Sequence, residues 1–423
     1  MDDFSALLRK LEGLGVKTGT SQLPERKEED KHPVIEDLIQ GRYESTRFGD
    51  IFTATTLYSF PYTHGCQPLV PPESVKNITK WAKYKESDEP EINSTLFLDT
   101  ETSGLAGGTG TFVFMIGLGW FDQSGFTVTQ LFMRDPSEEQ ALLAVLARLT
   151  DHYNCVVTYN GKSFDLPLLR SRHIQNHFPF DMGEWKHIDL LHLVRQVWKY
   201  SQESRTLKDM EVNILGFRRN QEEVPGWLVP QLYFEYLQTR DPRPLVGVFY
   251  HNAIDIVSLA ALFCAASQML DSPFEPLNIP STSADFIGLA RIFEKISLTE
   301  TAARLYATGI ENGLPDELEM PTLLRYADLC KRNGYTEDAI HLWSRAATLG
   351  NIDACVELAK YYEHQVFDYQ MAYSCTMKAI SFLPEKHSFI MKRQETELNN
   401  RLTRLIKKIN LTNDQEGVED VTQ

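Results

Sequence analysis

Short apolar runs alternate with turn residues between positions 95 and 159, as they do in a sheet with one covering helix. The apolar runs predict strands over residues 95–99, 112–121, 127–134 and 155–159. The turn at 122–125, Asp-Gln-Ser-Gly, should close a hairpin between the second and third strands. Leucines at helical spacing predict a helix after Ser137, with Ser137 as N-cap and Gln140 completing a capping box. The pattern therefore predicts a mixed α/β sheet.

The segments before and after this sheet predict further units. Residues 1–40 should form a short amphipathic helix over 4–14 and a charged linker. β-Branched and aromatic residues alternate over 41–75, which predicts a small strand-rich segment, 41–90, packing on the core. Apolar residues at helical spacing after 251 predict a buried helix, which ends the main domain at residue 272.

Residues 284–410 carry a weak repeat. Each of the three repeat units carries two dipeptides that end in alanine, one in each predicted helix. The dipeptides are Leu289-Ala290 with Thr301-Ala302, Tyr326-Ala327 with Asp338-Ala339, and Leu358-Ala359 with Met371-Ala372. The pattern predicts three stacked helix pairs with alanines at the crossings, which is typical of tetratricopeptide (TPR)-like arrays that bind a protein partner. Alternatively, the repeats only brace the main domain or guide its substrate. A basic helix over 386–408 should either cap the array or contact nucleic acid, and residues 411–423 are predicted to be disordered.

Composition narrows the class of protein. The chain has 423 residues and is 42% hydrophobic, which is enough for two or three domains. Its net charge of −16 argues against a wide, sequence-independent grip on nucleic acid. The six cysteines are scattered, so they indicate neither a zinc site nor a disulfide framework. The N-terminus lacks the features of a signal peptide and no apolar run reaches a membrane span, so we expect a cytoplasmic protein without membrane contact.

Acidic residues at three places could converge on metal ions. Asp99 and Glu101 end a predicted strand and point to the same side, because strand side chains repeat every second residue. Two adjacent buried acids are costly unless a divalent cation pairs with them; the alternative is two solvated acids at a strand end. Asp165 lies in the first turn of a helix, where it either joins the metal site or acts as an ordinary capping residue. His251 and Asp255, four residues apart, share a helix face as a base beside a metal ligand, or as a satisfied core pair.

Taken in order, these motifs resemble those of the DEDD exonuclease superfamily, whose fold is ribonuclease-H-like. The motifs are Asp99-x-Glu101, Asn160-x-x-x-Phe164-Asp165 and His251-x-x-x-Asp255. The phrases at 98–105, 158–161 and 251–255 are similar to those of the YprB family of Gram-positive bacteria. The resemblance spans residues 93–270. It implies a ribonuclease-H-like mixed sheet flanked by helices, an exonuclease domain over 91–272, followed by an all-α TPR-like repeat domain.

The resemblance also implies a mechanism, two-metal hydrolysis of phosphodiester bonds from the 3′ end. Asp99 would bridge two divalent cations, Mg²⁺ or Mn²⁺, and Glu101, Asp165 and Asp255 would complete their ligands. One branch of the superfamily places a His five residues before the last Asp, and another a Tyr four before it. Here Tyr250 is five residues and His251 four residues before Asp255. His251 is the preferred base because an imidazole titrates near neutrality, and Tyr250 is held in reserve.

Several residues around the motifs are candidates for binding nucleic acid: Thr102, Gly104, Leu105, Asn160, Lys162, Phe164 and Arg170. Arg170 belongs to a basic cluster that either contacts phosphates or forms a solvated face: Arg170, Arg172, Lys186, Arg195, Lys199, Arg205 and Lys208. Three aromatic residues could stack on bases or belong to the core: Trp227, Tyr233 and Tyr236. Asp189 is either a supporting acid or an exposed acid at a strand end.

The expected activity is thus metal-dependent 3′–5′ exonuclease, acting on DNA in repair in preference to RNA. The repeat domain would recruit a protein partner, and a helicase that exposes 3′ ends would suit the chemistry. Two alternatives stay open, an RNA exonuclease and a non-catalytic scaffold that keeps the fold only for binding and assembly.

Overall fold

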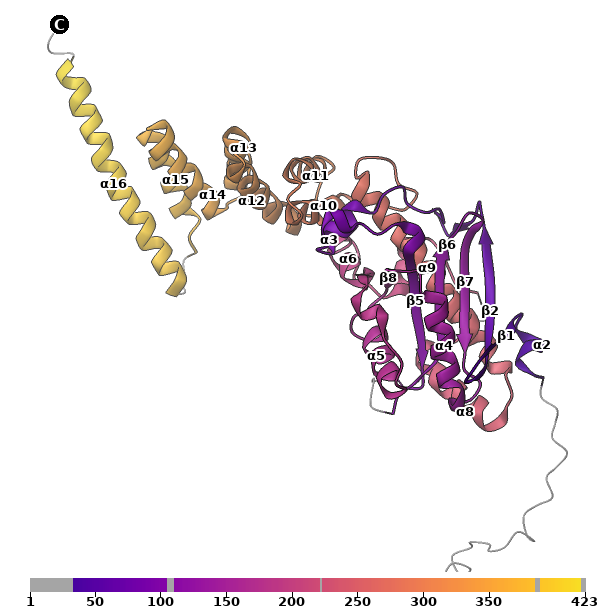
Figure 1. Cartoon of the computed structure of the whole chain (residues 1–423). Coiled ribbons are helices and arrows are strands. Elements are labelled where there is room, and N and C mark those ends of the chain that lie inside the picture. Colours follow the sequence, from indigo (N-terminus) through magenta and orange to yellow (C-terminus); the bar gives the residue numbers. More distant parts are fainter. Residues whose placement is uncertain (1–32, 105–109, 221–222, 385–388, 420–423) are drawn as a thin grey trace, which may run out of the picture.

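A seven-stranded mixed sheet forms the body of the protein, and a series of helices extends from one side of it (Figure 1). The computed structural model describes residues 33–104, 110–220, 223–384 and 389–419. The strands of the main sheet are β1 (Arg42–Thr46), β2 (Gly49–Ser59), β5 (Thr95–Thr102), β6 (Val113–Phe121), β7 (Gly125–Phe132), β8 (Cys155–Thr158) and β9 (Lys186–Asp189). They lie in the order β1-β2-β7-β6-β5-β8-β9; β5, β8 and β9 are parallel, and all other neighbours are antiparallel.

The predicted fold class is confirmed, namely a mixed sheet flanked by helices and followed by an all-helical region. The hairpin turn also lies where the sequence places it, because the Asp122 amide donates to the Gly125 carbonyl (3.0 Å). The cap of the next helix differs from the prediction. Asp135, not Ser137, accepts the first backbone N–H, and a short 3₁₀ turn, η4 (Pro136–Glu138), precedes helix α4 (Glu139–Thr150).

Two helices cover opposite faces of the sheet. Alternating residues of β5 enter different cores: Phe97 packs in the cluster under α9 (Val246–Asp271), and Leu96 and Leu98 pack in the cluster with α4. Helix α9 is apolar on all sides because it is enclosed between the sheet and other helices. The remaining helices of this part are α2 (Ile35–Leu38), α3 (Lys76–Trp81), α5 (Asp165–Gln175), α6 (Leu190–Val197), α7 (Leu207–Asn213) and α8 (Val229–Thr239).

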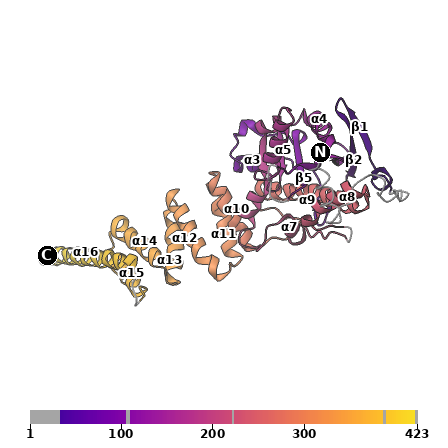
Figure 2. The ribbon, with the colours of Figure 1, turned by 90° about the horizontal axis from the view of Figure 1, so that it is seen from below.

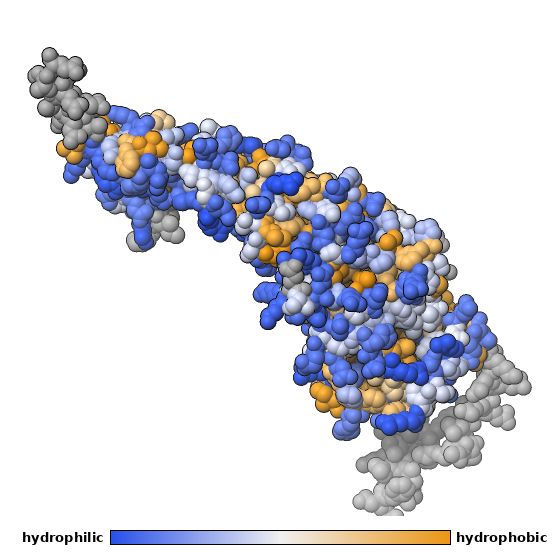
Figure 3. All heavy atoms as spheres, turned by 45° about the horizontal axis from the view of Figure 1, so that its top comes forward, coloured by the Kyte–Doolittle hydropathy of each residue, from blue (hydrophilic) through white to orange (hydrophobic). Residues whose placement is uncertain are grey.

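The expectation that no apolar run reaches a membrane span was wrong. The helical segment Arg243–Asp271 is long and apolar enough, but 83% of its most apolar window is buried inside the protein. It is therefore a core helix by its packing. On the face drawn in Figure 3, hydrophobic residues lie in separate patches among hydrophilic ones.

The segment 41–90, which we expected to pack on the core as a small unit, contributes directly to the main sheet. Strands β1 and β2 extend it as its outer strands, with β2 paired to β7. The rest of the segment forms a two-stranded hairpin, β3 (Thr63–His64) and β4 (Gln67–Pro68), and helix α3. The helix predicted over residues 4–14 and its linker lie outside the described residues.

The C-terminal region consists of helices that pack in consecutive pairs (Figures 1 and 2). They are α10 (Ser283–Lys295) with α11 (Thr299–Glu311), α12 (Asp316–Arg332) with α13 (Thr336–Thr348), α14 (Ile352–Tyr361) with α15 (Tyr369–Ser381), and the terminal α16 (Phe389–Glu419). All six alanines of the sequence repeat have zero exposure: Ala290, Ala302, Ala327, Ala339, Ala359 and Ala372. The repeat pattern therefore marks positions where helices approach too closely for a larger side chain.

Helix α16 runs past the position at which we predicted disorder. It continues to Glu419, whereas the predicted tail began at residue 411. The sequence from 411 to 419 contains no proline and a single glycine, so nothing in it forces the helix to end.

The helical region is joined to the sheet domain through a shared hydrophobic core. One continuous cluster runs from α9 and α6 into α10 and α11, including Leu193, Ala290 and Tyr306. The closest approach is at Gly288 of α10, where an added Cβ would lie 2.0 Å from the carbonyl oxygen of Val197. The first helix pair is thus part of the domain core rather than a freely hinged attachment.

Substitution of Gly288 by valine is expected to separate α10 from α6. Because the clash is with backbone, it cannot be relieved by a side-chain rotation, and we expect a loss of at least about 2 kcal/mol in the free energy of unfolding. Chemical denaturation measures this loss. Gly183→Ala is the matched control, since its Cβ would meet Phe180 at ordinary contact distance (3.4 Å); an equally small effect for both variants would contradict the tight docking.

Candidate active site

Four acidic residues converge at the end of the central strand β5. Asp99 and Glu101 lie on β5, where a bulge between Glu101 and Thr102 ends regular pairing with β6. Asp165 is the first residue of α5 and accepts a hydrogen bond from Thr100 Oγ1 of the same strand (2.5 Å). Asp255 comes from the opposite side, on α9, and interacts electrostatically with both Asp99 and Glu101. The structure thus brings together all four predicted ligands.

A metal ion fits part of this cluster directly. One ligand atom each of Glu101, His251 and Asp255 lies within 4.8 Å of the others. The set consists of carboxylate oxygens and one imidazole, and Asp99 and Asp165 add two further carboxylates beside it. Such an oxygen-rich set suits Mg²⁺ or Mn²⁺.

Burial and neighbouring negative charges raise the pKa values of Asp99, Glu101 and Asp165. Burial raises the pKa of Asp99 well above its usual value, and the charges of Asp255, Glu101 and Asp165 raise it further. Glu101 behaves in the same way, through burial and then Asp255 and Asp165. Burial also raises the pKa of Asp165, to about 6, despite the hydrogen bond from Thr100. This repulsion destabilises the cluster whenever no cation is bound.

These pKa values predict that Asp165→Asn stabilises the ion-free protein at high pH. An acid whose folded pKa is raised contributes its stability below the unfolded value of 3.8 and loses it as the pH rises through about 6. At pH 8 we therefore expect the variant to be more stable than the wild type by about 2–3 kcal/mol, and at pH 4 to be equal to it. Asn keeps the acceptor for Thr100. Denaturant titrations in EDTA at both pH values test this; a pH-independent difference would contradict it.

Two amide side chains outside the predicted set of site residues support the cluster. Asn252 is fully buried on α9 and donates to Asp99 Oδ2 (2.9 Å). Gln130 of β7 in turn donates to Asn252 Oδ1 (3.0 Å), which fixes the orientation of the amide. Gly117 pairs with Asp99 across the sheet and leaves the space that Asn252 fills, since an added Cβ would lie 2.4 Å from Asn252 Oδ1.

Asp189 is a supporting acid, not an exposed one. It has zero exposure and accepts backbone N–H bonds from Asn160 (2.8 Å), Lys162 (3.0 Å) and Leu191 (3.2 Å). Asn160 has a positive φ of 68°, the left-handed conformation that Asn tolerates. Asp189 therefore shapes the loop that delivers Asp165 to the site.

A buried arginine that sequence analysis missed also enters the cluster. The Arg219 side chain is only 4% exposed and pairs with Glu211 Oε1 (2.6 Å) and with Asp255 Oδ1. Its Nη1 is 3.1 Å from Nδ1 of His251, and Nε2 of His251 is 3.4 Å from Asp255 Oδ2. The hydroxyl of Tyr250, the other candidate base, accepts from the backbone N–H of Asn220 (3.1 Å).

The residues proposed to hold nucleic acid surround the site with different exposures. Lys162, Phe164 and Arg170 are exposed, and the ring of Phe164 is 55% exposed, although it is apolar. Thr102 and Gly104 are half-buried, with Thr102 Oγ1 donating to the Gly104 carbonyl (2.9 Å). Leu105 lies outside the described residues.

Some members of the predicted basic cluster are bound to other residues of the protein, and others are exposed. Arg172 is bound to Glu139 (2.5 Å), Lys208 to Glu223 (3.0 Å), and Arg205 donates to backbone carbonyls such as that of Glu203 (2.9 Å). Arg170, Arg195 and Lys199 are exposed. Of the aromatic candidates, Tyr233 and Tyr236 belong to the core, and Trp227 is 69% exposed.

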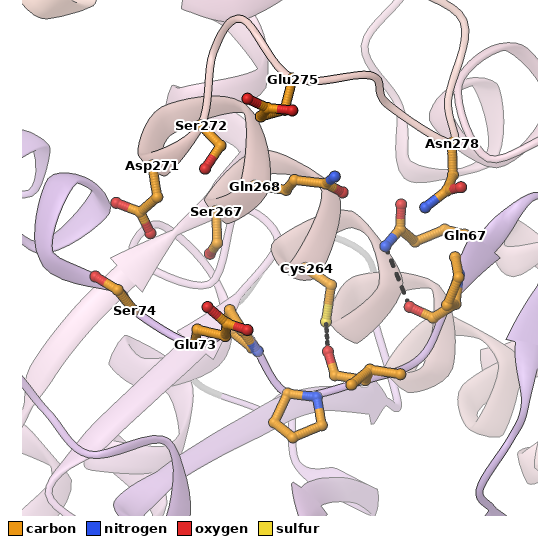
Figure 4. A pocket seen from close by; sticks show the side chains of 14 residues that line it. Gln67, Glu73, Ser74, Cys264, Ser267, Gln268, Asp271, Ser272, Glu275 and Asn278 are labelled. Carbon is orange, nitrogen blue, oxygen red and sulfur yellow. Dashed lines mark hydrogen bonds between the residues drawn. The ribbon is translucent and has the colours of Figure 1, made fainter.

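A separate hollow lies toward the other end of α9 (Figure 4). It has a volume of about 430 Å³ and is lined by Cys264, Asp271 and Glu275 together with residues of the segment 67–74. Cys264 is nine residues beyond Asp255, or about 13 Å along the helix axis. This hollow is therefore not the acid site.

Comparisons with known proteins agree with this geometry. Residues 96–267, which contain all four acids, match the RNase_H superfamily. The chain is 32% identical over 323 residues to the uncharacterized protein YprB of Bacillus subtilis (strain 168), covering 75% of each chain. The chain belongs to the YprB family. Membership of the RNase_H superfamily points to nuclease-type hydrolysis and to nucleic acid as the substrate of this YprB-family chain.

A solved structure was also matched, the family B DNA polymerase of the hyperthermophilic archaeon Pyrobaculum calidifontis. The identity is 16% and the TM-score 0.31, with 49% of this chain and 29% of the polymerase chain covered. The likeness is too small to add to the argument.

Proposed function

We propose that this protein is a metal-dependent 3′–5′ exonuclease of the DEDD type that hydrolyses phosphodiester bonds of nucleic acid. The observation that carries the proposal is the convergence of Asp99, Glu101, Asp165 and Asp255 from three separate elements. A fold has no structural reason to bury carboxylates side by side where burial and neighbouring acids raise their pKa values, as they do for Asp99 and Glu101. A site that binds divalent cations has such a reason.

Two divalent cations, Mg²⁺ or Mn²⁺, would be held by the carboxylates of Asp99, Glu101, Asp165 and Asp255. When bound, such ions supply an activated water and stabilise the leaving oxygen. The protein's own residues orient the ligands: Asn252 holds Asp99, Thr100 holds Asp165, and the Asp189 loop positions α5. His251, beside Asp255, and Tyr250 are the candidates for moving the proton of the water.

The substrate proposal is DNA in repair, in preference to RNA. Exposed Lys162 and Arg170 offer phosphate contacts, and exposed Phe164 offers a stacking surface next to Asp165. These few contacts suit an enzyme that holds the end of a strand and does not need a broad basic surface, in agreement with the net charge of −16.

We further propose that the helix pairs α10–α15 form a TPR-like array that binds a protein partner in the cytoplasm. The buried alanines of each pair and the stacking of consecutive pairs support this assignment. A helicase that generates 3′ ends is the kind of partner that would supply the substrate.

One observation favours the alternative of a non-catalytic scaffold. Arg219 pairs with Asp255, so a permanent cation already compensates one of the four acids. A scaffold could use this pair in place of a metal ion, and it would then show neither divalent-ion binding nor hydrolysis.

The test is a side-by-side digestion of single-stranded DNA and RNA labelled at either end, with Mg²⁺, Mn²⁺ or EDTA. The proposal predicts that a 3′ label is released at once as a mononucleotide, whereas a 5′ label is retained on progressively shorter strands. EDTA should stop the digestion of both labelled substrates. Absence of cleavage under all conditions, together with no Mn²⁺ binding by electron paramagnetic resonance, would support the scaffold.

A further inference from the structure

We propose that Arg219 is a positioning residue of the acid site, and that its guanidinium holds both Asp255 and the imidazole of His251 in one arrangement. The inference rests on the proposed function for its catalytic consequence, but its geometric part stands on contacts alone. Arg219 lies in the segment between α7 and α8, outside the three acidic motifs.

All three nitrogens of the Arg219 guanidinium contact polar side chains. Nε and Nη2 donate to the two oxygens of Glu211 (2.7 and 2.6 Å), and Nη2 also donates to Asp255 Oδ1. Nη1 approaches Nδ1 of His251 (3.1 Å) and Glu223 Oε1 (3.6 Å). A planar guanidinium that is hydrogen-bonded along each of its edges can adopt only one orientation. It therefore fixes the orientation of the side chains that it contacts.

The contact to His251 also determines which ring nitrogen carries the proton. A guanidinium can only donate, so Nδ1 must accept, and the proton of the neutral ring then lies on Nε2. Nε2 is 3.4 Å from Asp255 Oδ2, toward which it can donate. In this arrangement His251 has no free lone pair, so the groups left to ligate a cation beside it are the carboxylates of Glu101 and Asp255. His251 therefore acts as an N–H donor beside Asp255, which differs from the expectation that it accepts the proton of the water.

The segment that carries Arg219 is held firmly by its neighbours. The Phe217 amide donates to the Glu211 carbonyl (2.8 Å), and the Phe217 ring stacks on the buried ring of His64, with centroids 3.9 Å apart. His64 Nε2 is hydrogen-bonded to Ser258 of α9 (2.8 Å). The hairpin β3–β4, through His64, thus supports the segment that carries Arg219.

Glu211 explains why a cation can be buried beside the acids without neutralising the site. Its side chain is 1% exposed and forms a two-pronged pair with Arg219, so the pair adds no net charge to the cluster. The four acids keep their attraction for divalent cations, and Arg219 contributes orientation. Lysine at this position would restore the charge but could not make the same set of contacts.

The geometric part is tested by nuclear magnetic resonance on ion-free protein labelled with ¹⁵N-histidine. Long-range ¹H–¹⁵N spectra distinguish the two neutral tautomers, and His251→Gln identifies the signals. Wild type should show the proton of His251 on Nε2 alone, whereas Arg219→Lys and Arg219→Gln should show a mixture of tautomers. An unchanged tautomer in both variants, or a wild-type proton on Nδ1, would overturn the proposal.

The catalytic part is tested by Mn²⁺ affinity and single-turnover kinetics. We expect Arg219→Lys to lower kcat by about 10- to 100-fold with little change in KM, and to weaken Mn²⁺ binding by about 10-fold, as for other residues that orient metal ligands. Arg218→Gln, which changes the exposed neighbouring arginine, is the matched control and should stay within twofold of wild type.

A double variant separates positioning from folding. Glu211→Gln/Arg219→Gln removes both members of the buried pair, so neither is left as an uncompensated charge; the variant should fold, yet show the same loss as Arg219→Lys. Wild-type kinetics in this variant, or full rescue by lysine, would show that Arg219 serves only to neutralise Glu211. If wild type itself neither binds Mn²⁺ nor cleaves, the proposed function fails, and the tautomer measurement still decides the contact between Arg219 and His251.

Discussion

Replacement of Asp99 by asparagine is expected to reduce hydrolysis by at least about 1,000-fold. Asp99 lies among the other acids, since Asp255, Glu101 and Asp165 all raise its pKa in addition to burial. Its carboxylate would therefore be a ligand of a cation bound by the cluster. Asparagine keeps the size and an oxygen, so the loss reports the charge and not a cavity. The measurement is kcat/KM on a 3′-labelled strand under saturating Mg²⁺.

The control for this variant is Asp181→Asn, which removes one exposed negative charge from the same domain. It should leave kcat/KM within about twofold of wild type, because exposed charges far from a site are screened. Retention of a tenth or more of the wild-type activity by Asp99→Asn would exclude the four-acid site as the catalytic centre. Any cleavage in the preparation would then have another source.

The acids could be predicted from sequence because each is coupled to a local pattern. Asp99 and Glu101 follow a buried strand, Asp165 begins a helix after a turn, and His251 and Asp255 lie four apart on an apolar helix. Each pattern is short and involves neighbouring positions. The local patterns alone do not show that the three motifs meet at one site. That expectation came from the resemblance to a known superfamily.

The supporting residues could not be predicted, because their roles depend on contacts between distant elements. Asn252 donates to Asp99, 153 positions away, and its space is left by a glycine on a third element. Arg219 is one of two adjacent arginines in an irregular segment, and only the fold shows that it is buried while Arg218 is exposed. Asp189 was visible as an acid at a strand end, but its burial depends on the loop that folds over it.

In the helical region, too, local sequence patterns could be predicted and contacts between distant elements could not. The repeated alanines predicted where helices cross, since a small residue is required at each close contact, and all six proved to be buried. The extent of α16 was not predicted, because its basic and polar residues look like those of a solvated helix or tail. The helix packs through buried Leu398 and Leu405 and through cations that bind one acid, Glu363, which has no counterpart in the repeat pattern.

Replacement of Glu363 by glutamine is expected to release α16 from the helical region. Glu363 has zero exposure and lies in a π-helical turn, Tyr362–Val366. It accepts from three cations of α16: Arg401 (2.7 Å), Arg404 (2.7 Å) and Lys408 (3.0 Å). Glutamine preserves the shape but leaves these cations without their shared anion. We expect a loss of about 3 kcal/mol, since breaking a buried pair leaves uncompensated charge.

The pKa of Glu363 gives this prediction a second, independent readout. Burial alone would raise that pKa, but hydrogen bonds from Arg404 and Lys408 outweigh it and lower the pKa to about 2. The stabilisation is therefore complete above the unfolded value of 4.5 and is lost as the pH falls toward 2. Hydrogen exchange of α16 should accelerate in Glu363→Gln at pH 7, and wild type should approach the variant only in acid. Glu397→Gln, which breaks an exposed pair with Arg393 on the same helix, should change exchange little. Equal protection of α16 in the two variants would mean that apolar contacts such as Leu398 and Leu405, and not the buried acid, hold the helix in place.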